Sequence, residues 1–187
     1  MIPAEESYRN QVATAASFIL NICSNIPVTA VQLGTGLGDV TDRLKIEHEI
    51  SYEDIPWFPK STVESHRGTL LIGLLESFPT LILSGRFHFY EGYSTRVITL
   101  PIRVLQILGV RNLIITNAAG GLNPLFLPGT IMIIRDHLNF LGENPLRGAN
   151  IEDWGPRFPD FSEPYGPDLI KTALESADHC RIGKVVT

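Results

Sequence analysis

The sequence runs Thr80-Leu81-Ile82-Leu83-Ser84-Gly85-Arg86-Phe87-His88-Phe89-Tyr90-Glu91-Gly92, an apolar segment followed by two glycines that bracket Arg, His, Tyr and Glu. The apolar residues 80–83 are typical of a buried strand. In open α/β sheets, ligands bind beyond the carboxyl ends of the strands. Arg86 and His88 stand two residues apart at such an end and can both face one anion. We therefore expect a site for phosphate or a carboxylate here.

Length and charge narrow the possible partners. The 187 residues suffice for one sizeable core, so we expect a single domain over residues 1–187. The net charge of −5 argues against a nucleic acid or an anionic membrane as partner and favours a small ligand. The acidic N-terminus is unlike a signal peptide, and Cys23 and Cys180 lack metal-site spacing. We expect a cytoplasmic protein with structural thiols.

Apolar strands alternate with helical patterns along the chain, which predicts an α/β fold: a mixed, mostly buried β-sheet flanked by helices. Residues 69–75 and 80–83 are expected to form a hairpin. Pro101 lies inside the helix expected at 95–108, so it should kink that helix or delay its start. Residues 141–167 should form a long loop, because they show no apolar period. The predicted helices are 4–24, 39–44, 95–108 and 168–177; the predicted strands are 28–33, 69–75, 80–83, 112–116, 130–135 and a last one starting at Arg181.

Two segments offer anion-binding chemistry. Gly34-Thr35-Gly36-Leu37-Gly38 follows a predicted strand, so its backbone N–H groups and the Thr35 hydroxyl could approach a phosphate. An ordinary strand-to-helix turn explains this string about equally well. Arg86 offers a planar fork of donors, His88 adds a further donor, and Glu91 could fix the His88 tautomer. A surface arginine with a backbone-bonded histidine is the plainer alternative.

Two other segments are weaker evidence for ligand binding when each is taken alone. His66 lies in a loop before a strand, and Asn117-Ala118-Ala119-Gly120-Gly121 ends a strand with small residues, where the Ala118 N–H could serve as a donor. The motifs of zinc proteases, dithiol sites and serine hydrolases are missing from the sequence. His137 and His179 have no metal-ligand neighbours at suitable spacing, so no metal is expected.

Taken together, these strings resemble the purine nucleoside phosphorylases of the trimeric, low-molecular-mass class, in order and spacing from about residue 5 to the end. The resemblance extends over seven segments: Gly34–Gly38, Ile55–Val63 with His66 and Gly68, Gly85–Tyr93, Thr116–Pro124, Ile134–His137, Asn144–Gly148 and Arg157–Pro159. The methylthioadenosine phosphorylases share the fold but usually differ in the glycine loop and after the histidine, so they rank second. Position 35 is often Ser in the family, and Thr keeps the hydroxyl.

The resemblance implies reversible phosphorolysis of purine nucleosides, of the inosine and guanosine type, to free base and ribose 1-phosphate in purine salvage. Arg86 and His88 would be catalytic, Tyr90 would lie against the ribose, and Phe158 would reach the site of a neighbouring subunit in a homotrimer. Inorganic phosphate would be a co-substrate, with no cofactor and no metal. The phosphate-binding residues implied are Thr35, His66, Arg86, Phe87, His88 and Ala118.

Members of that family continue well past the position that corresponds to residue 187. In those proteins the additional segment supplies the purine-binding residues. The fold is therefore expected to be incomplete at its C-terminus, with the phosphate half of the site present. On this reading phosphate still binds near Arg86, whereas efficient phosphorolysis of inosine is lost. The alternative from another class is a non-catalytic remnant that serves as an anion-binding or subunit-interaction module.

Overall fold

The computed structural model describes residues 4–59 and 68–187 and separates into two compact units. The first unit extends to Ala118 and includes Pro145–Ala149. The second consists of Ala119–Asn144 and Asn150–Thr187. The assignment of all 187 residues to one domain stays a prediction.

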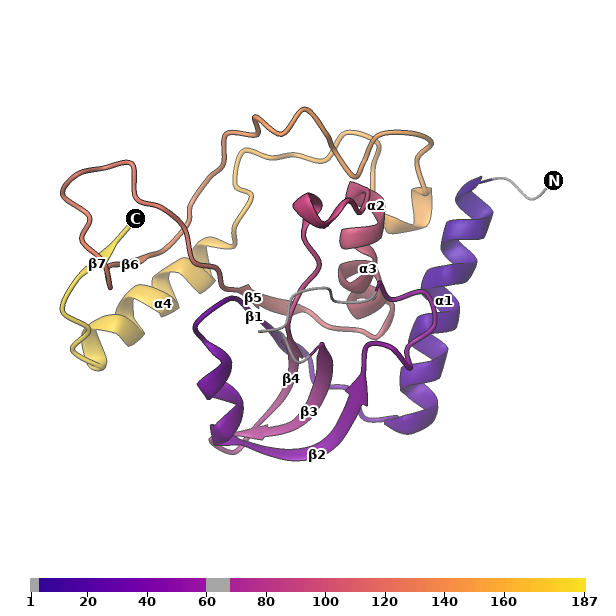
Figure 1. Cartoon of the computed structure of the whole chain (residues 1–187), viewed down its shortest axis with the longest axis horizontal. Coiled ribbons are helices and arrows are strands. Elements are labelled where there is room, and N and C mark those ends of the chain that lie inside the picture. Colours follow the sequence, from indigo (N-terminus) through magenta and orange to yellow (C-terminus); the bar gives the residue numbers. More distant parts are fainter. Residues whose placement is uncertain (1–3, 60–67) are drawn as a thin grey trace. The chain divides into compact units, whose positions relative to one another are not determined.

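The first unit is built on a five-stranded mixed sheet with helices, as the sequence predicted (Figure 1). Its strand order is β2-β3-β4-β1-β5. The strands are β1 (Thr29–Leu33), β2 (Leu44–Ser51), β3 (Thr69–Leu75), β4 (Phe78–Ser84) and β5 (Asn112–Ile115).

Three of these strands run parallel, with β1 in the middle. β1 pairs with β4, where Leu33 lies opposite Ser84, and with β5, where Gln32 lies opposite Ile115. Parallel neighbours present their carboxyl ends at one edge of a sheet. The segments that follow β1, β4 and β5 therefore start side by side.

The hairpin of β3 and β4 is confirmed, with seven residue pairs from Thr69↔Ser84 to Leu75↔Phe78. Its turn is formed by Glu76 and Ser77, whose φ angles of 50° and 84° are those of a tight two-residue turn. Alternate residues of the two strands face opposite sides of the sheet, and residues on both sides are buried. One side carries Leu71 and Ile82; the other carries Leu70, Ile72, Leu81 and Leu83. Burial on both faces explains why these strands are almost continuously apolar.

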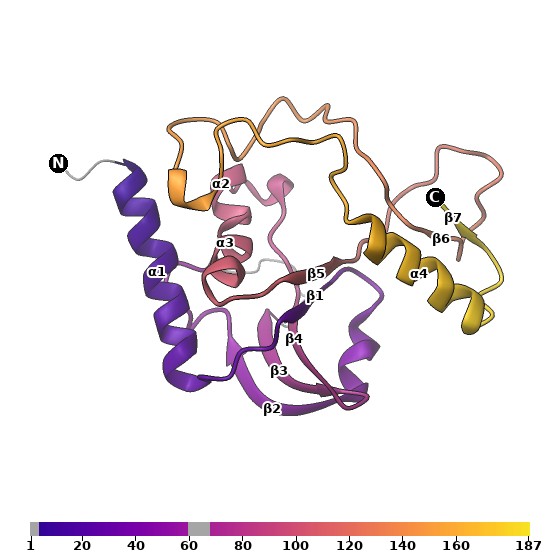
Figure 2. The same ribbon diagram turned by 180° about the vertical axis from the view of Figure 1, so that it is seen from behind.

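Helices α1 (Ala4–Ile22), α2 (Thr95–Ile98) and α3 (Leu100–Ile107) complete the first unit. Figures 1 and 2 both show α1 beside α3. The predicted break at Pro101 is confirmed: α2 ends at Ile98, and α3 starts with Pro101 in its first turn, where the missing N–H costs no helical hydrogen bond. Ser94 caps α2 by accepting a hydrogen bond from the Val97 N–H at 3.3 Å.

The second unit contains helix α4 (Pro167–His179) and a parallel pair of two-residue strands, β6 (Ile131–Met132) and β7 (Val185–Val186). The predicted strands here were too long, because an apolar run of this kind becomes a strand only where another strand pairs with it. The expected long loop is confirmed, with one short 3₁₀ helix, η3 (Glu152–Trp154), inside it. Among the described residues, no helix is long and apolar enough to cross a membrane.

Strand β2 and the helical segment before it show where the sequence pattern was misread. The expected helix at 39–44 is the 3₁₀ helix η1 (Gly38–Arg43), and β2 was not predicted. Its apolar residues Leu44, Ile46 and Ile50 do alternate with charged ones, which is the signal for an edge strand. The pairing with β3 shifts between Ile46 and His48, so a bulge interrupts the alternation.

Gly73 of β3 lies opposite this bulge, and its replacement by Ala tests the packing. A Cβ atom there would lie far inside van der Waals distance of the Lys45 carbonyl oxygen, a backbone atom that cannot swing away. We expect Gly73→Ala to lower the free energy of unfolding by about 1–3 kcal/mol, measured by urea denaturation. Gly38→Ala is the matched control, because a Cβ there meets nothing within 4 Å. Equal stability of the two variants would contradict the packing argument.

Candidate functional site

The segments after β1, β4 and β5 meet at Gly34. A Cβ atom on this residue would lie 2.5 Å from the Thr116 carbonyl oxygen and 2.8 Å from the Asn117 Cα, so only glycine lets the two chains approach this closely. The Gly34 N–H donates to the Thr116 hydroxyl at 2.8 Å, and that hydroxyl donates to the Gln32 carbonyl at 3.0 Å. The glycine loop after β1 is thereby joined to the end of β5.

Arg86, the second residue after β4, extends into the same junction. Its Nη1 donates to the Thr116 carbonyl oxygen at 3.2 Å, and its Nε donates to His88 Nε2 at 3.3 Å. A guanidinium has five N–H groups, and two of them are used in these bonds among the described residues. The remaining donors of the fork are suited to oxyanion oxygens.

His88 is held by the buried carboxylate of Glu91, whose side chain is 3% exposed. Glu91 Oε1 lies 2.7 Å from His88 Nδ1 and accepts a hydrogen bond from the His88 backbone N–H at 2.8 Å. Arg86 Nε can only donate, so His88 Nε2 must accept, and the ring proton belongs on Nδ1, facing the carboxylate. The predicted role of Glu91 in fixing the His88 tautomer agrees with this geometry.

The aromatic residues beside these groups have different surroundings. The Tyr90 ring stacks on the His88 ring at 4.7 Å between centroids and is 76% exposed, so one face remains open. Phe87, in contrast, packs its buried ring against Tyr52, with 5.4 Å between the ring centroids. The Tyr52 hydroxyl donates to the Gly85 carbonyl at 3.0 Å, and burial raises the pKa of this phenol, so it remains a donor. Tyr52 thus anchors the start of the segment that carries Arg86.

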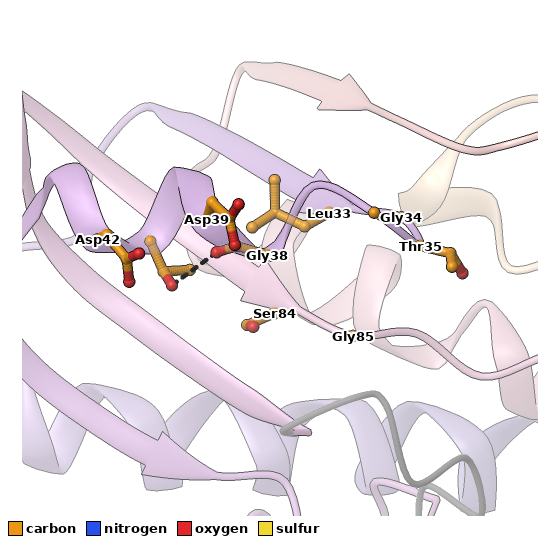
Figure 3. A pocket seen from close by; sticks show the side chains of 10 residues that line it. Leu33, Gly34, Thr35, Gly38, Asp39, Asp42, Ser84 and Gly85 are labelled. Carbon is orange, nitrogen blue, oxygen red and sulfur yellow. Dashed lines mark hydrogen bonds between the residues drawn. The ribbon is translucent and has the colours of Figure 1, made fainter. Parts of the chain in front are cut away.

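A pocket of about 250 Å³ lies between the glycine loop, η1 and the end of β4. Figure 3 shows Asp39 and Asp42 projecting from η1, while Thr35 lies at the far end of the loop. Ser84 and Gly85 complete the wall at the end of β4 (Figure 3). Two carboxylates disfavour a phosphate dianion by like-charge repulsion. The surroundings of Arg86 are therefore the better anion site.

The structure brings some of the expected residues together and leaves others apart. Arg86 and His88 are in contact, and Ala118 is two residues beyond Thr116, the backbone partner of Arg86. Thr35 is exposed beside Gly34. Phe158 belongs to the second unit, where it is 88% exposed, and His66 lies outside the described residues.

Sequence reasoning missed Thr116 and Tyr52 as supporting residues. Their bonds join positions far apart in the chain, and a polar residue at a strand end or an aromatic one in a loop carries no signal of such a partner. The described residues contain no group of three or more His, Cys, Asp and Glu side chains that could hold a metal ion.

Known proteins share the sequence pattern and the fold of this chain. Residues 29–187 match the family model described as the phosphorylase superfamily. Purine nucleoside phosphorylase 1 of Bacillus subtilis is 47% identical over 174 residues, which are 93% of this chain and 64% of that protein. Purine nucleoside phosphorylase of Mus musculus is 48% identical over 164 residues, which are 86% of this chain and 57% of that protein.

A solved structure gives the same result for the fold. The crystal structure of isoform 2 of purine nucleoside phosphorylase from Schistosoma mansoni, in complex with cytosine and ribose-1-phosphate, has a TM-score of 0.86 and 39% identity to this chain. The match covers 95% of this chain and 63% of that one. The chain thus spans less than two thirds of the length of these relatives.

The family resemblance predicted from the sequence is therefore confirmed. With a family model matched over residues 29–187 and relatives that are named purine nucleoside phosphorylases, this chain belongs to the phosphorylase superfamily.

Proposed function

We propose that this protein acts in the reversible phosphorolysis of purine nucleosides and that its first unit binds the phosphate. The observation that carries the proposal is the junction of Gly34, Arg86 and Thr116 at the carboxyl ends of three parallel strands. This edge is where α/β sheets bind their ligands. Arg86 brings to it a positive charge and donors that are unused among the described residues.

The chemistry requires a phosphate held below the sugar of a nucleoside. A phosphate oxygen forms a bond to the anomeric carbon as the bond from that carbon to the purine nitrogen breaks. The electron pair of the broken bond leaves with the base, which takes up a proton. Positive charge develops on the sugar in the transition state, so an anion fixed beneath it stabilises this state as well as attacking it.

Each residue then has a role in the proposal. Arg86, the Thr35 hydroxyl and the Ala118 N–H bind phosphate. His88, expected from the sequence as a further donor, orients the guanidinium instead, because its two ring nitrogens bond to Glu91 and Arg86. Phe87 contributes through its backbone, because its ring is buried among aromatic side chains. His66 completes the group by resemblance alone. Tyr90 offers its open face to the ribose.

The resemblance also supports a homotrimer in which Phe158 reaches a neighbouring site, a cytoplasmic location, and inorganic phosphate as co-substrate without a further cofactor. Sedimentation analysis of the purified protein tests the trimer. A mass of one chain at micromolar concentration would contradict it.

Two measurements test the proposed activity. Calorimetric titration with inorganic phosphate reports binding at the site, and chromatography of reactions with inosine, guanosine or methylthioadenosine reports base release. Release of hypoxanthine or guanine that depends on phosphate supports the proposal. A preference for methylthioadenosine as substrate would instead assign the protein to the methylthioadenosine phosphorylases. Phosphate binding without release of any base would leave an anion-binding module instead of an enzyme. Failure to bind phosphate would contradict the whole proposal.

Arg86→Ala tests the anion site directly. Losing a charge-assisted donor should weaken phosphate binding by about 1–3 kcal/mol, measured as the Kd in calorimetry. Arg43→Ala is the matched control, because its side chain is 71% exposed and pairs with Glu76. An unchanged Kd for Arg86→Ala would remove this residue from the site.

Glu91→Gln tests the orientation of His88. The amide removes the negative charge that fixes the proton on Nδ1, so we expect a mixture of ring tautomers and weaker phosphate binding. The ¹⁵N shifts of the His88 ring report the tautomer, and the exposed Glu49→Gln is the control. A single, unchanged tautomer in Glu91→Gln would show that the carboxylate does not set it.

A further inference from the structure

We propose that Thr116 is a positioning residue for the phosphate site, and that its hydroxyl sets the geometry between the glycine loop and Arg86. This inference rests on the proposed function, because it assumes that the two segments share one phosphate. Thr116 would act through Gly34 and Arg86 without touching the ligand.

The hydroxyl continues the β1–β5 pairing beyond its last backbone rung. Regular pairing ends at Gln32 opposite Ile115, after which the Thr116 N–H still donates to the Gln32 carbonyl at 3.0 Å. Two residues after Gln32, the N–H of buried Gly34 donates to the Thr116 hydroxyl, where a regular ladder would offer it a backbone carbonyl. The side chain thus provides the acceptor that the departing backbone no longer offers.

Both hydrogen-bonding directions of this hydroxyl are in use. It accepts from the Gly34 N–H at 2.8 Å and donates to the Gln32 carbonyl at 3.0 Å, so its orientation is fixed from two sides. Thr35 follows Gly34 directly, which means that the hydroxyl determines where the loop carrying Thr35 leaves the sheet.

The backbone of the same residue holds Arg86. The Thr116 carbonyl accepts from Arg86 Nη1 at 3.2 Å, and the carbonyl also lies against Gly34, where a Cβ would come within 2.5 Å. One residue therefore contacts both sides of the site, the glycine loop through its hydroxyl and the guanidinium through its carbonyl. A shift of Thr116 would change the separation of the two groups that are proposed to bind one phosphate.

Thr116→Val removes the hydroxyl at constant shape and leaves the buried Gly34 N–H without its partner. We expect the Kd for inorganic phosphate to rise on the order of tenfold, because a buried donor without a partner drives the loop away from the sheet. Hydrogen exchange of the Gly34 amide should accelerate in the same variant. Thr116→Ser keeps the hydroxyl and should restore both values.

Thr80→Val is the matched control for stability. Thr80 is 4% exposed and donates its hydroxyl to the Phe78 carbonyl at 2.9 Å, near the start of β4 and away from Arg86. This variant loses a buried hydroxyl in the same sheet, so its unfolding free energy should fall while its Kd for phosphate stays unchanged. A merely structural role of Thr116 would make the two valine variants behave alike.

The outcomes separate this inference from the proposed function. Phosphate binding by the unchanged protein together with an unaltered Kd in Thr116→Val overturns the positioning role alone. An equal rise in Kd in Thr80→Val also overturns it. Failure of the unchanged protein to bind phosphate overturns the proposed function and this inference with it. Should Thr116→Val not fold, Thr116→Cys, whose thiol is a weak hydrogen-bonding group, must show the weaker binding, and an unaltered Kd there overturns the role.

Discussion

The parallel pairing of β1 with both β4 and β5 is the constraint on which the site depends. This pairing brings three strand ends to one edge of the sheet. The backbone hydrogen bonds between the strands stop before the glycine loop and the segment with Arg86 begin. Gly34 closes this gap, because its lack of a side chain lets the loop after β1 lie against Thr116. The site is therefore a direct continuation of the sheet, and its geometry follows from strand register more than from loop sequence.

A connected chain of hydrogen bonds then fixes the charged side chains of Arg86 and Glu91 relative to this sheet edge. It runs from the Glu91 carboxylate through both nitrogens of His88 to Arg86 and ends at the Thr116 carbonyl. Each link uses a group that can only donate or only accept, so the chain has one proton arrangement. Arg86 is thus oriented without a ligand, so binding of the proposed anion would cost less side-chain entropy.

The local elements of the first unit were largely predictable, because each has a local cause. β3 was predicted with its observed bounds from its apolar residues, and Pro101 placed the break between α2 and α3. β2 was not predicted, because a bulge disturbs its alternation of apolar and charged residues. Arg86, His88 and Glu91 were found by their short spacing. Thr116 and Tyr52 could not be found this way, since their bonds span 82 and 33 positions.

The described residues that are proposed to bind phosphate all belong to the first unit, where the buried core is concentrated. The second unit contributes Ile151 and Ala177 as its buried apolar residues, and its two-residue strands bury little surface by themselves. Every hydrogen bond of the chain from Glu91 to Gly34 lies within the first unit. The groups that orient Arg86 at the proposed anion site are therefore all supplied by this unit.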